Sequence, residues 1–438
     1  MIDQKKLKDT KIEWIGQVPS HWSLKKIKYV FWERKENNDP IQTDNLISLT
    51  IEKGVIPHSE KTGGGNKPKE DLSKYKIVRP GDIVLNSMNI IAGAVGISKY
   101  YGVVSPVYYM LIPLDESSSK EYFHHLFRTE PFQKSLYGLG NGILIKENEE
   151  TGKLNTIRMR IPMDKLGGQY IPLPPQSEQK LISTYLNKKT IQLNSLVEKI
   201  QTRIELLKEH RNSFINQCVT KGLNRNVEMK DSGVDWIGEI PKHWEISPMF
   251  TLFDENKLKN KDGRLDVLTL TYGKIKYRDI TKMEGLVPET FDGYQVMNID
   301  SIIIRSTDLQ NDHKSLRVGH VGIAGVITSA YLGLVPKNSS STKFYYYSIH
   351  LADLKKVLYG LGGGLRQSLR FDDFKRFPII NPPENERDLI ADRLDNFNRS
   401  IDELISKLER RISLLNEYRQ SLISSVVMGK HTVTEEMI

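Results

Sequence analysis

The sequence predicts an α+β protein with two duplicated domains and two long antiparallel coiled-coil helices, arranged with pseudo-twofold symmetry. The first observation is a repeated block, because residues 8–22 return as residues 230–244 with Trp-Ile-Gly, a proline and His-Trp at matching places. The second is a pair of matched diprolines, at 174–175 and 382–383, each followed by a long heptad pattern. The third is that the two halves differ between these blocks. Because the two halves share their end blocks but differ between them, we expect two domains of one fold that carry related but different binding sites.

Length and charge set the broad class. A chain of 438 residues is too long for one ordinary domain, and the repeat divides it into halves that can each bury a core. Lysine and arginine total 63 against 54 aspartate and glutamate residues, which gives a formal net charge of +9. This balance favours a polyanionic partner, but many basic proteins bind no nucleic acid, so charge alone leaves the partner open.

The cysteine content and the hydropathy pattern indicate the compartment. Cys218 is the only cysteine, which excludes a disulfide framework within the chain and a cysteine-based zinc site. No apolar stretch approaches the roughly 18 residues of a membrane span, and the first residues lack the apolar run of a signal peptide. We therefore expect a soluble cytoplasmic protein.

Residues 1–170 are predicted to form the first α+β domain. Short β-rich runs such as residues 82–85, after the turn Pro80-Gly81, alternate with polar loops. Basic and amide side chains on such loops are the kind that reach phosphates and base edges of DNA. Each one alone is more often a solvated surface residue, so the set carries the prediction. The candidates in this domain are Lys61, Lys67, Lys69, Asn86, Asn89 and Asn141.

Residues 171–222 are predicted to contain the first long helix. The diproline suits a helix start because the first amides have no intrahelical partner, and Glu178 favours the positive end of the helix dipole. A helix of about 40 to 45 residues at ~1.5 Å rise would measure about 60 to 68 Å, so we expect a spacer. Apolar residues recur every seven positions and form a seam that needs a partner helix. The seam residues are Leu186, Leu193, Ile200, Leu207 and Phe214.

Residues 223–380 are predicted to form the second domain, with the fold of the first. Residues 325–331 match residues 102–108 in sequence pattern, and Leu-Tyr-Gly-Leu-Gly occurs at both 136–140 and 358–362. The loops between these matches carry a different pattern of basic residues, and the segment 366–370 just past a triple glycine is the strongest candidate for base contact. The candidates in this domain are Lys274, Lys276, Tyr277, Arg278, Arg366, Gln367 and Arg370.

Residues 381–430 are predicted to contain the second long helix. Antiparallel pairing of the two seams is the economical solution, because each helix then buries about five large side chains worth roughly 1.5–3 kcal/mol each before entropy costs. Arg203 and Arg411 stand at equivalent positions in the seams, where they either fix the register or extend to solvent. The second seam consists of Leu394, Ile401, Leu408, Leu415 and Leu422.

One segment suggests catalysis. Residues 381–384, Asn-Pro-Pro-Glu, resemble the Asn-Pro-Pro-aromatic tetrapeptide of amino-methyltransferases, but the counterpart at 173–176 has neither the asparagine nor an aromatic residue. A helix start explains both segments. No metal-ligand spacing of histidines and no nucleotide-binding glycine loop is present, and His21 and His243 each stand beside a matched tryptophan, which favours packing. We expect no catalytic residue and no metal or cofactor bound by this chain.

The repeated block Trp-Ile-Gly-x-hydrophobic-Pro-x-His-Trp, a variable region with Tyr-Gly-x-Gly, a diproline and a heptad helix follow one another in both halves. This order resembles the specificity (S) subunit of type I restriction–modification enzymes over essentially the whole chain. The resemblance implies two target recognition domains, each reading one half of a split, asymmetric sequence in double-stranded DNA, and two helices that set the unread spacer. The chain would then be a non-catalytic subunit in the prokaryotic cytoplasm.

The resemblance also implies protein partners. Two methyltransferase (M) subunits that carry S-adenosylmethionine would dock on the chain, and restriction (R) subunits that use ATP and magnesium would join them. Trp14 and Trp236 in the repeated block are expected to be exposed and to make the chain dependent on these partners. The main alternative is a coiled-coil scaffold that binds proteins only. A stand-alone methyltransferase or nuclease is disfavoured because the chain lacks a cofactor loop.

Overall fold

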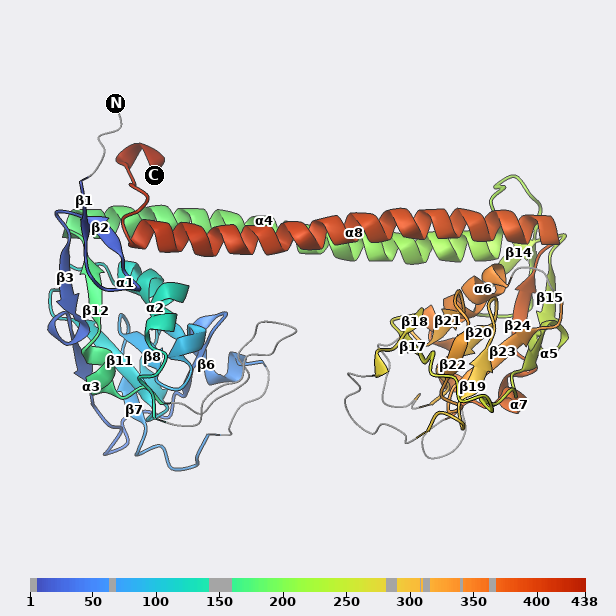
Figure 1. Ribbon diagram of the computed structural model, residues 1–438, viewed down its shortest axis with the longest axis horizontal. Coiled ribbons are helices and arrows are strands. Elements are labelled where there is room, and N and C mark those ends of the chain that lie inside the picture. Colours follow the sequence, from blue (N-terminus) through green and yellow to red (C-terminus); the bar gives the residue numbers. More distant parts are fainter. Residues whose placement is uncertain are drawn as a thin grey trace. The chain divides into compact units, whose positions relative to one another are not determined.

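The computed structural model describes residues 6–62, 68–141, 160–280, 290–307, 309, 316–338, 342–361 and 368–438. The chain divides into two compact units. Unit 1 comprises Met1–Ile200 with Arg410–Ile438, and unit 2 comprises Gln201–Glu409. Each unit holds one α+β domain together with part of each long helix (Figure 1). The sequence-based ranges differ in that they treat each helix as a segment of its own.

The domain of unit 1 is built on a four-stranded antiparallel sheet in the order β4-β11-β8-β9. Its strands are β4 (Phe31–Arg34), β8 (Ile83–Asn86), β9 (Val95–Ile97) and β11 (Tyr108–Pro113). Two-stranded pairs flank it: β1 (Leu7–Asp9) with β2 (Gln17–Pro19), β3 (Ser23–Lys26) with β12 (Tyr170–Leu173), β5 (Ile47–Thr50) with β6 (Gly54–Pro57), and β7 (Lys76–Val78) with β10 (Gly102–Val104). The short helices are α1 (Lys120–Phe127), α2 (Glu130–Ser135) and α3 (Met163–Gly167), with 3-10 turns η1 (Ile27–Tyr29), η2 (His58–Glu60), η3 (Ile90–Ala92) and η6 (Glu435–Met437).

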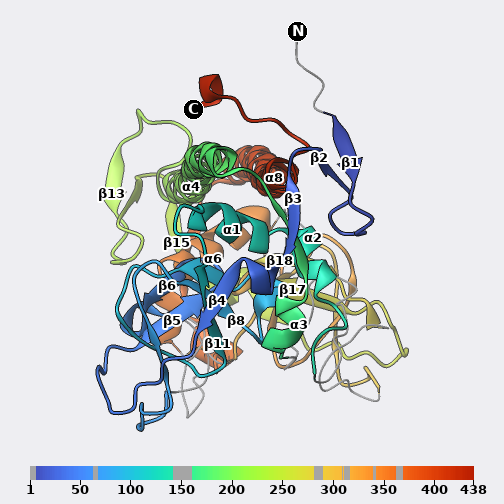
Figure 2. The ribbon, with the colours of Figure 1, turned by 90° about the vertical axis from the view of Figure 1, so that its left-hand side faces the viewer.

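Helix α1 lies between the sheet and the long helices of unit 1 (Figure 2). Phe123 and Phe127 pack against Phe31 of β4, with ring centroids 4.7 and 5.8 Å from that ring. The buried hydroxyl of Tyr122 donates a 3.1 Å hydrogen bond to the carbonyl of Val427, at the end of the second long helix. The sheet, α1 and the long helices of this unit therefore share one hydrophobic core.

The domain of unit 2 repeats this arrangement. Its four-stranded sheet has the order β16-β23-β20-β21, with strands β16 (Phe253–Glu255), β20 (Ile302–Ile304), β21 (Val318–His320) and β23 (Leu332–Pro336). The flanking pairs are β13 (Met229–Asp231) with β14 (Glu239–Pro241), β15 (Glu245–Pro248) with β24 (Pro378–Asn381), β17 (Leu268–Thr271) with β18 (Lys274–Tyr277), and β19 (Gln295–Met297) with β22 (Gly325–Ile327). Its helices are α5 (Met249–Leu252), α6 (Lys343–Leu354) and α7 (Phe371–Phe374), with the 3-10 turn η5 (Val357–Gly360). The equal strand order confirms that both halves have one fold.

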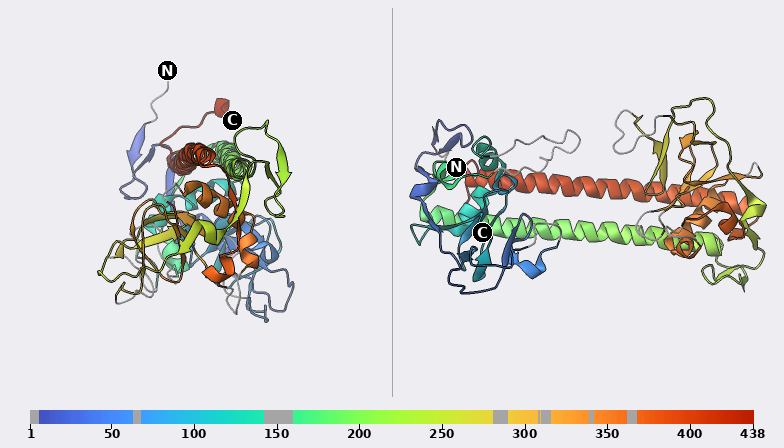
Figure 3. Two further views of the ribbon diagram at one scale, coloured as in Figure 1. Left: turned by 90° about the vertical axis from the view of Figure 1, so that its right-hand side faces the viewer. Right: turned by 90° about the horizontal axis from the view of Figure 1, so that it is seen from below.

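The long helices begin directly after the diprolines, as predicted. Helix α4 (Gln176–Lys221) has 46 residues and α8 (Glu384–Val427) has 44. In unit 1, Asn194 of α4 contacts Arg419 of α8, and in unit 2, Arg211 of α4 contacts Asp402 of α8. Residue numbers thus rise along one helix as they fall along the other, and the helices are antiparallel within each unit (Figure 3).

The predicted seams are the apolar faces that these helices bury. Arg203 and Arg411 are exposed, so the structure favours their extension to solvent over a role in fixing the register. The fully buried seam residues are Leu186, Ile200, Leu394, Ile401, Leu408 and Leu422. The partly buried ones are Leu193, Leu207, Phe214 and Leu415.

The repeated His-Trp pair fastens each domain to the start of a long helix. In unit 1, the indole N–H of Trp22 donates to Glu178 Oε2 at 3.0 Å, and His21 Nε2 lies 2.5 Å from Glu178 Oε1. In unit 2, Trp244 and His243 make the same contacts with Glu386 at 3.0 and 2.7 Å. The motif in the sequence is thus a structural connection between domain and helix.

The same tryptophans contact the end of the other long helix. Gly429 and Gly222 follow α8 and α4 with positive φ values of 69° and 71°, a backbone conformation that favours glycine at a helix end. A Cβ at Gly222 would lie 3.0 Å from the Trp244 ring, and one at Gly429 would lie 3.0 Å from the Trp22 ring. Each tryptophan therefore holds one helix start and one helix end within its own unit.

Trp14 and Trp236 are not the exposed residues that we expected. Trp14 is half-buried and its ring packs edge-on against Phe132 at 5.5 Å, while Trp236 stacks on Phe377 at 5.6 Å. Both rings are used in the core of their own unit, because α2 in unit 1 and the segment before β24 in unit 2 cover them. Within the described residues, no helix combines the length and apolarity needed to cross a membrane.

Candidate nucleic-acid interface

Two buried asparagines shape equivalent loops in the two domains. Asn38 Oδ1 accepts hydrogen bonds from the amides of Gln42 and Thr43 at 2.8 and 3.2 Å. Asn260 Oδ1 accepts from the Arg264 amide at 2.9 Å, and its Nδ2 donates to the Arg264 carbonyl at 3.0 Å. Both side chains are fully buried. Each asparagine therefore replaces backbone pairing and fixes a loop whose tip carries polar side chains.

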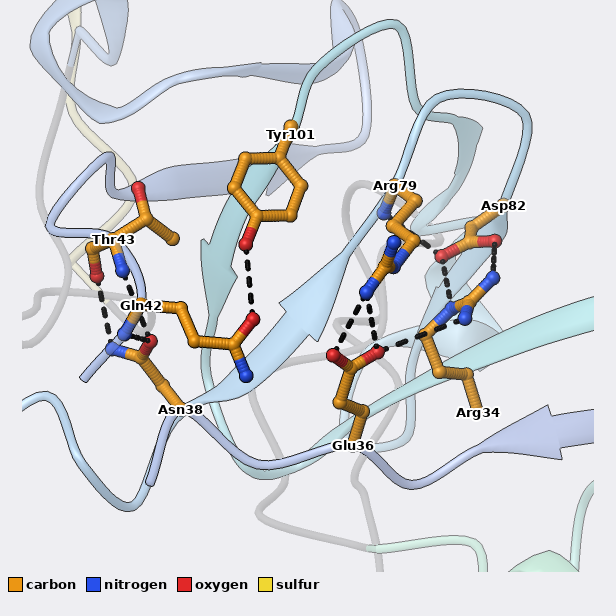
Figure 4. Close-up of polar contacts among 8 residues, drawn as sticks. All are labelled: Arg34, Glu36, Asn38, Gln42, Thr43, Arg79, Asp82 and Tyr101. Carbon is orange, nitrogen blue, oxygen red and sulfur yellow. Dashed lines mark hydrogen bonds and ion pairs between the residues drawn. The ribbon is translucent and has the colours of Figure 1, made fainter. Parts of the chain in front are cut away.

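In unit 1 the loop is part of a polar cluster with an exposed aromatic ring (Figure 4). The Tyr101 hydroxyl donates to Gln42 Oε1 at 3.2 Å, and the guanidinium carbon of Arg79 lies 5.7 Å from the centre of the Tyr101 ring. Arg79 Nη2 also pairs with Glu36 at 2.9 Å. A cation over an aromatic ring beside an amide is a combination that can contact phosphates and bases.

A nearly buried ion pair between Arg34 and Asp82 lies next to this cluster and holds the backbone of Arg79 in place. Arg34 Nε and Nη2 donate to the two carboxylate oxygens of Asp82 at 3.0 and 3.2 Å, and the side chain of Asp82 is 3% exposed. Asp82 Oδ2 also accepts from the Arg79 amide at 2.9 Å, which fixes the backbone that carries the arginine. The hydrogen bond from Arg79 to Glu36 raises the pKa of Arg79, so the guanidinium remains a cation.

The corresponding cluster in unit 2 uses different residues. Arg264 pairs with Asp266 through two hydrogen bonds of 3.1 and 2.7 Å, and hydrogen bonding to Asp266 raises the pKa of Arg264. The hydroxyl of Tyr277 donates to the Ala324 carbonyl at 3.2 Å. In unit 1 the matching Tyr101 carbonyl accepts from an asparagine amide, that of Asn45, at 2.7 Å. The two domains thus present unlike polar groups on one scaffold.

The first-domain candidates from the sequence lie in several places. Asn86 is 8% exposed and its Oδ1 accepts from the Met88 amide at 3.0 Å, so its side chain is used in a turn. Lys61 is half-buried, while Lys69 and Asn89 are exposed. Lys67 lies outside the described residues. Their contact with DNA stays a prediction, and the structure does not bring them into one cluster.

Asn141 lines a cavity of about 550 Å³ in unit 1, together with Lys76 and Arg160. The Asn141 backbone pairs with Arg160 at 3.0 and 3.2 Å. The ammonium of Lys76 pairs with Glu33 at 3.3 Å and lies over the Tyr109 ring at 5.3 Å. Neither Lys76 nor Arg160 was predicted, because neither stands in a recognisable motif.

The second-domain candidates are mostly exposed. Lys276, Tyr277 and Arg278 are on the surface at the end of β18, and Arg370 is exposed at the start of α7. Lys274 instead directs its ammonium to Asp402 of α8, with 2.5 Å between Nζ and Oδ2. The remaining two candidates, Arg366 and Gln367, lie outside the described residues.

The asparagine of the methyltransferase-like segment is hydrogen-bonded within its own domain. Asn381 Oδ1 accepts from the Tyr345 hydroxyl at 2.7 Å, and its Nδ2 donates to Ser247 Oγ at 3.1 Å. The amide is therefore engaged inside the domain and is not presented to a base. In the described ranges, no group of three or more histidine, cysteine, aspartate or glutamate side chains could hold a metal ion. Burial raises the pKa of the Cys218 thiol to about 11, which makes it an unreactive core residue.

Comparisons with known proteins agree with this architecture. Residues 241–414 match the family described as "Type I restriction modification DNA specificity domain". A chain in the structure of a type I R-M system, solved to explain its assembly and conformational transition, is 13% identical with a TM-score of 0.61 over 94% of this chain and 99% of that chain. The HsdS subunit from Thermoanaerobacter tengcongensis is 13% identical with a TM-score of 0.52 over 94% of this chain and 98% of its own. At this identity the two structures establish the fold. No curated protein matches the sequence.

Proposed function

We propose that the chain is a type I restriction–modification specificity subunit and that it reads a bipartite, asymmetric DNA site with one domain per half-site. The match of residues 241–414 to the DNA specificity domain family and the shared fold support this proposal. The observation that carries the proposal is the pair of clusters on one scaffold. The cluster of one domain contains Arg79, Tyr101 and Gln42, and the cluster of the other contains Arg264, Asp266 and Tyr277. Since different side chains read different base edges, the two half-sites would differ in sequence.

The long helices would set the distance between the two half-sites. Helix α4 has 46 residues, which at ~1.5 Å rise corresponds to about 69 Å. Both helices are connected to their domains through a buried tryptophan and a glutamate, so a change in helix length would be transmitted to the domains. The spacer between the half-sites is then a property of helix length and not of the loops that contact DNA.

The chemistry would belong to partner subunits. Methyltransferase subunits, of which two copies would match the duplicated scaffold, would supply S-adenosylmethionine. Restriction subunits would supply the steps that depend on ATP and magnesium. The engaged amide of Asn381 supports a non-catalytic role for this chain. We therefore place the chain in the complex as the component that selects the sequence.

The test is to co-express the chain with its methyltransferase partner and to map methylated adenines in the DNA of the host. The expected result is a split, asymmetric motif in which exchange of residues 245–380 changes one half only. Exchange of the first domain should change the other half. Methylation that does not depend on this chain, with both proteins folded and associated, would instead favour the protein-only scaffold. The affinity of the assembled complex for DNA is measured in parallel at several salt concentrations, because DNA binding should weaken steeply as the salt concentration rises.

A further inference from the structure

A second polar site lies in unit 1 and shares no residue with the Arg79 cluster of that unit. A cavity of about 530 Å³ opens between the domain and the long helices of this unit. Arg128, which follows α1, lines it from the domain, and Arg419 and Asn194 line it from α8 and α4. The turn after β5 contributes Ile51 and Glu52. Two arginines therefore line one cavity, one from the domain and one from α8.

The hydrogen bonds of both arginines go to neutral oxygens. Arg128 Nη2 donates to the Ile51 carbonyl at 2.9 Å, and Arg419 Nη1 donates to Asn194 Oδ1 at 2.5 Å. Among the residues that the structure describes, no carboxylate forms an ion pair with either guanidinium. Glu52 is exposed on the rim and pairs with neither. Most of the donors of both side chains remain available to a molecule in the cavity.

Two histidines, His124 and His125, also line the cavity. Burial lowers the pKa of His124 to about 3, and burial also lowers the pKa of His125, whose Nε2 lies 2.9 Å from Asn187 Oδ1. Both imidazoles are therefore neutral at pH 7. Burial, and then the charge of Arg419, lower the pKa of Arg128, so an anion between the two guanidinium groups would be stabilised.

The other unit shows what this site lacks. Arg211 precedes Arg419 by 208 residues, the same separation as between the matched seam residues Leu186 and Leu394. At the position equivalent to Asn194, unit 2 has Asp402, which pairs with Arg211 at 2.5 Å. The scaffold thus keeps the arginine in both units, and unit 1 replaces its anionic partner by a neutral amide.

We propose that this cavity binds a small tetrahedral oxyanion of the phosphate class between Arg128 and Arg419. The anion supplies to Arg419 the negative charge that Asp402 supplies to Arg211 in unit 2, and it connects α1 to the long helices. Arginine forks match two oxygens of such an anion, which chloride does not offer. None of the cavity's residues belongs to the Arg79 cluster.

The experiment is a phosphate titration of the full chain, monitored by calorimetry and by the unfolding temperature, against sodium chloride at equal ionic strength. Phosphate should bind with one site per chain and raise the unfolding temperature more than chloride does. Arg128→Gln and Arg419→Gln should each weaken phosphate binding at least tenfold. Lys165→Gln, which removes an exposed charge on α3 of the same unit, should leave it unchanged.

Asn194→Asp is the decisive variant because it installs the carboxylate of unit 2. It should raise the unfolding temperature without phosphate and abolish the phosphate response. Equal effects of phosphate and chloride on the wild-type chain, or a phosphate response that survives in the Asn194→Asp variant, would overturn the proposal. If free phosphate has no effect but a short DNA duplex produces the same Asn194-dependent response, the source of the oxyanion is a DNA backbone phosphate.

Discussion

Glu178 and Glu386 show how much one side chain contributes at the residue scale. Each carboxylate accepts the indole N–H of a tryptophan that is at most 2% exposed. We expect Glu178→Ala and Glu386→Ala each to cost about 1.5–3 kcal/mol, because a buried N–H loses a charged acceptor. Thermal unfolding of the full chain measures this, and Glu384→Ala, an exposed acid at the start of α8, is the matched control. A control variant that is equally destabilised would contradict the assignment.

Substitution of Arg79 and of Arg264 tests the two proposed half-sites separately. Arg79→Ala removes the cation over the Tyr101 ring in unit 1, and Arg264→Ala removes the cation that pairs with Asp266 in unit 2. Each substitution should weaken discrimination at one half-site by about 1–3 kcal/mol per base pair read. Competition between duplexes with one scrambled half measures this in the complete complex. Equal weakening on every duplex would identify the residue as a phosphate contact.

The sequence predicted only part of the residue-scale picture. The His-Trp pair was found because it occurs twice in a long shared block, although its glutamate partner lies more than 140 residues away in the chain. Asn38 and Asn260 were missed because a single asparagine between unlike loops has no pattern. Arg79 was missed for the same reason, since only folding brings it next to Tyr101 and Glu36.

At the element scale, the hairpin β17–β18 is attached to the long helix of its unit. Asp402 of α8 forms ion pairs with both Lys274 and Arg211, each at 2.5 Å. Lys343 at the start of α6 pairs with Asp395 of α8 at 2.7 Å. Lys274 was a candidate for DNA contact on sequence alone. The structure gives its ammonium a partner within the protein, so its role in binding DNA stays a prediction.

We expect Asp402→Asn to destabilise unit 2 by about 1 kcal/mol, a modest value because the carboxylate is 38% exposed and partly screened. Burial is the largest influence and raises the pKa of Asp402, but the hydrogen bonds and charges of Lys274 and Arg211 outweigh it, so the pKa is lowered. A lowered folded-state pKa means that this stabilisation is complete above the ordinary aspartate pKa of about 3.9. It is lost as the pH falls through the lower folded value.

Unfolding of wild type and Asp402→Asn between pH 3 and pH 7 checks both statements. The difference between the two proteins should be largest near neutral pH and should shrink towards acid. A difference that stays constant down to the lowest pH would show that the side chain acts by packing and not by charge. Added salt should reduce the difference at neutral pH, since exposed ion pairs are screened.

Elements were predictable in proportion to their length. The long helices repeat an apolar residue every seven positions over 46 and 44 residues, so their starts and pairing face could be predicted. Strands of three or four residues, such as β7 or β19, are too short for a period of two to appear. Their positions are fixed by tertiary pairing, for example of β7 with β10 and of β19 with β22.

At the scale of the whole molecule, the length of the helices is the quantity that the proposed function depends on. The register is constant along them, because the contact shifts from Asn194 to Arg211 on α4 as it shifts from Arg419 to Asp402 on α8, 17 residues in each case. One heptad can therefore be removed from both helices without changing the seam. Residues 198–204 of α4 and 409–415 of α8 are matched heptads on this register.

Removing both heptads shortens the pair by about 10 Å, since seven residues rise ~1.5 Å each. This corresponds to about three base pairs at ~3.4 Å per base pair. A heptad changes the helix rotation by only about 20°, so the domains keep their faces towards the helices. We expect the preferred spacer in the methylated motif to shorten by about three base pairs while both half-site sequences stay the same.

Methylation mapping on a library of spacer lengths measures this preferred spacer. As a control, exposed residues of the same heptads are exchanged without deletion, which should leave the spacer unchanged. If the deleted protein folds, assembles and methylates with the original spacer, helix length does not set the distance.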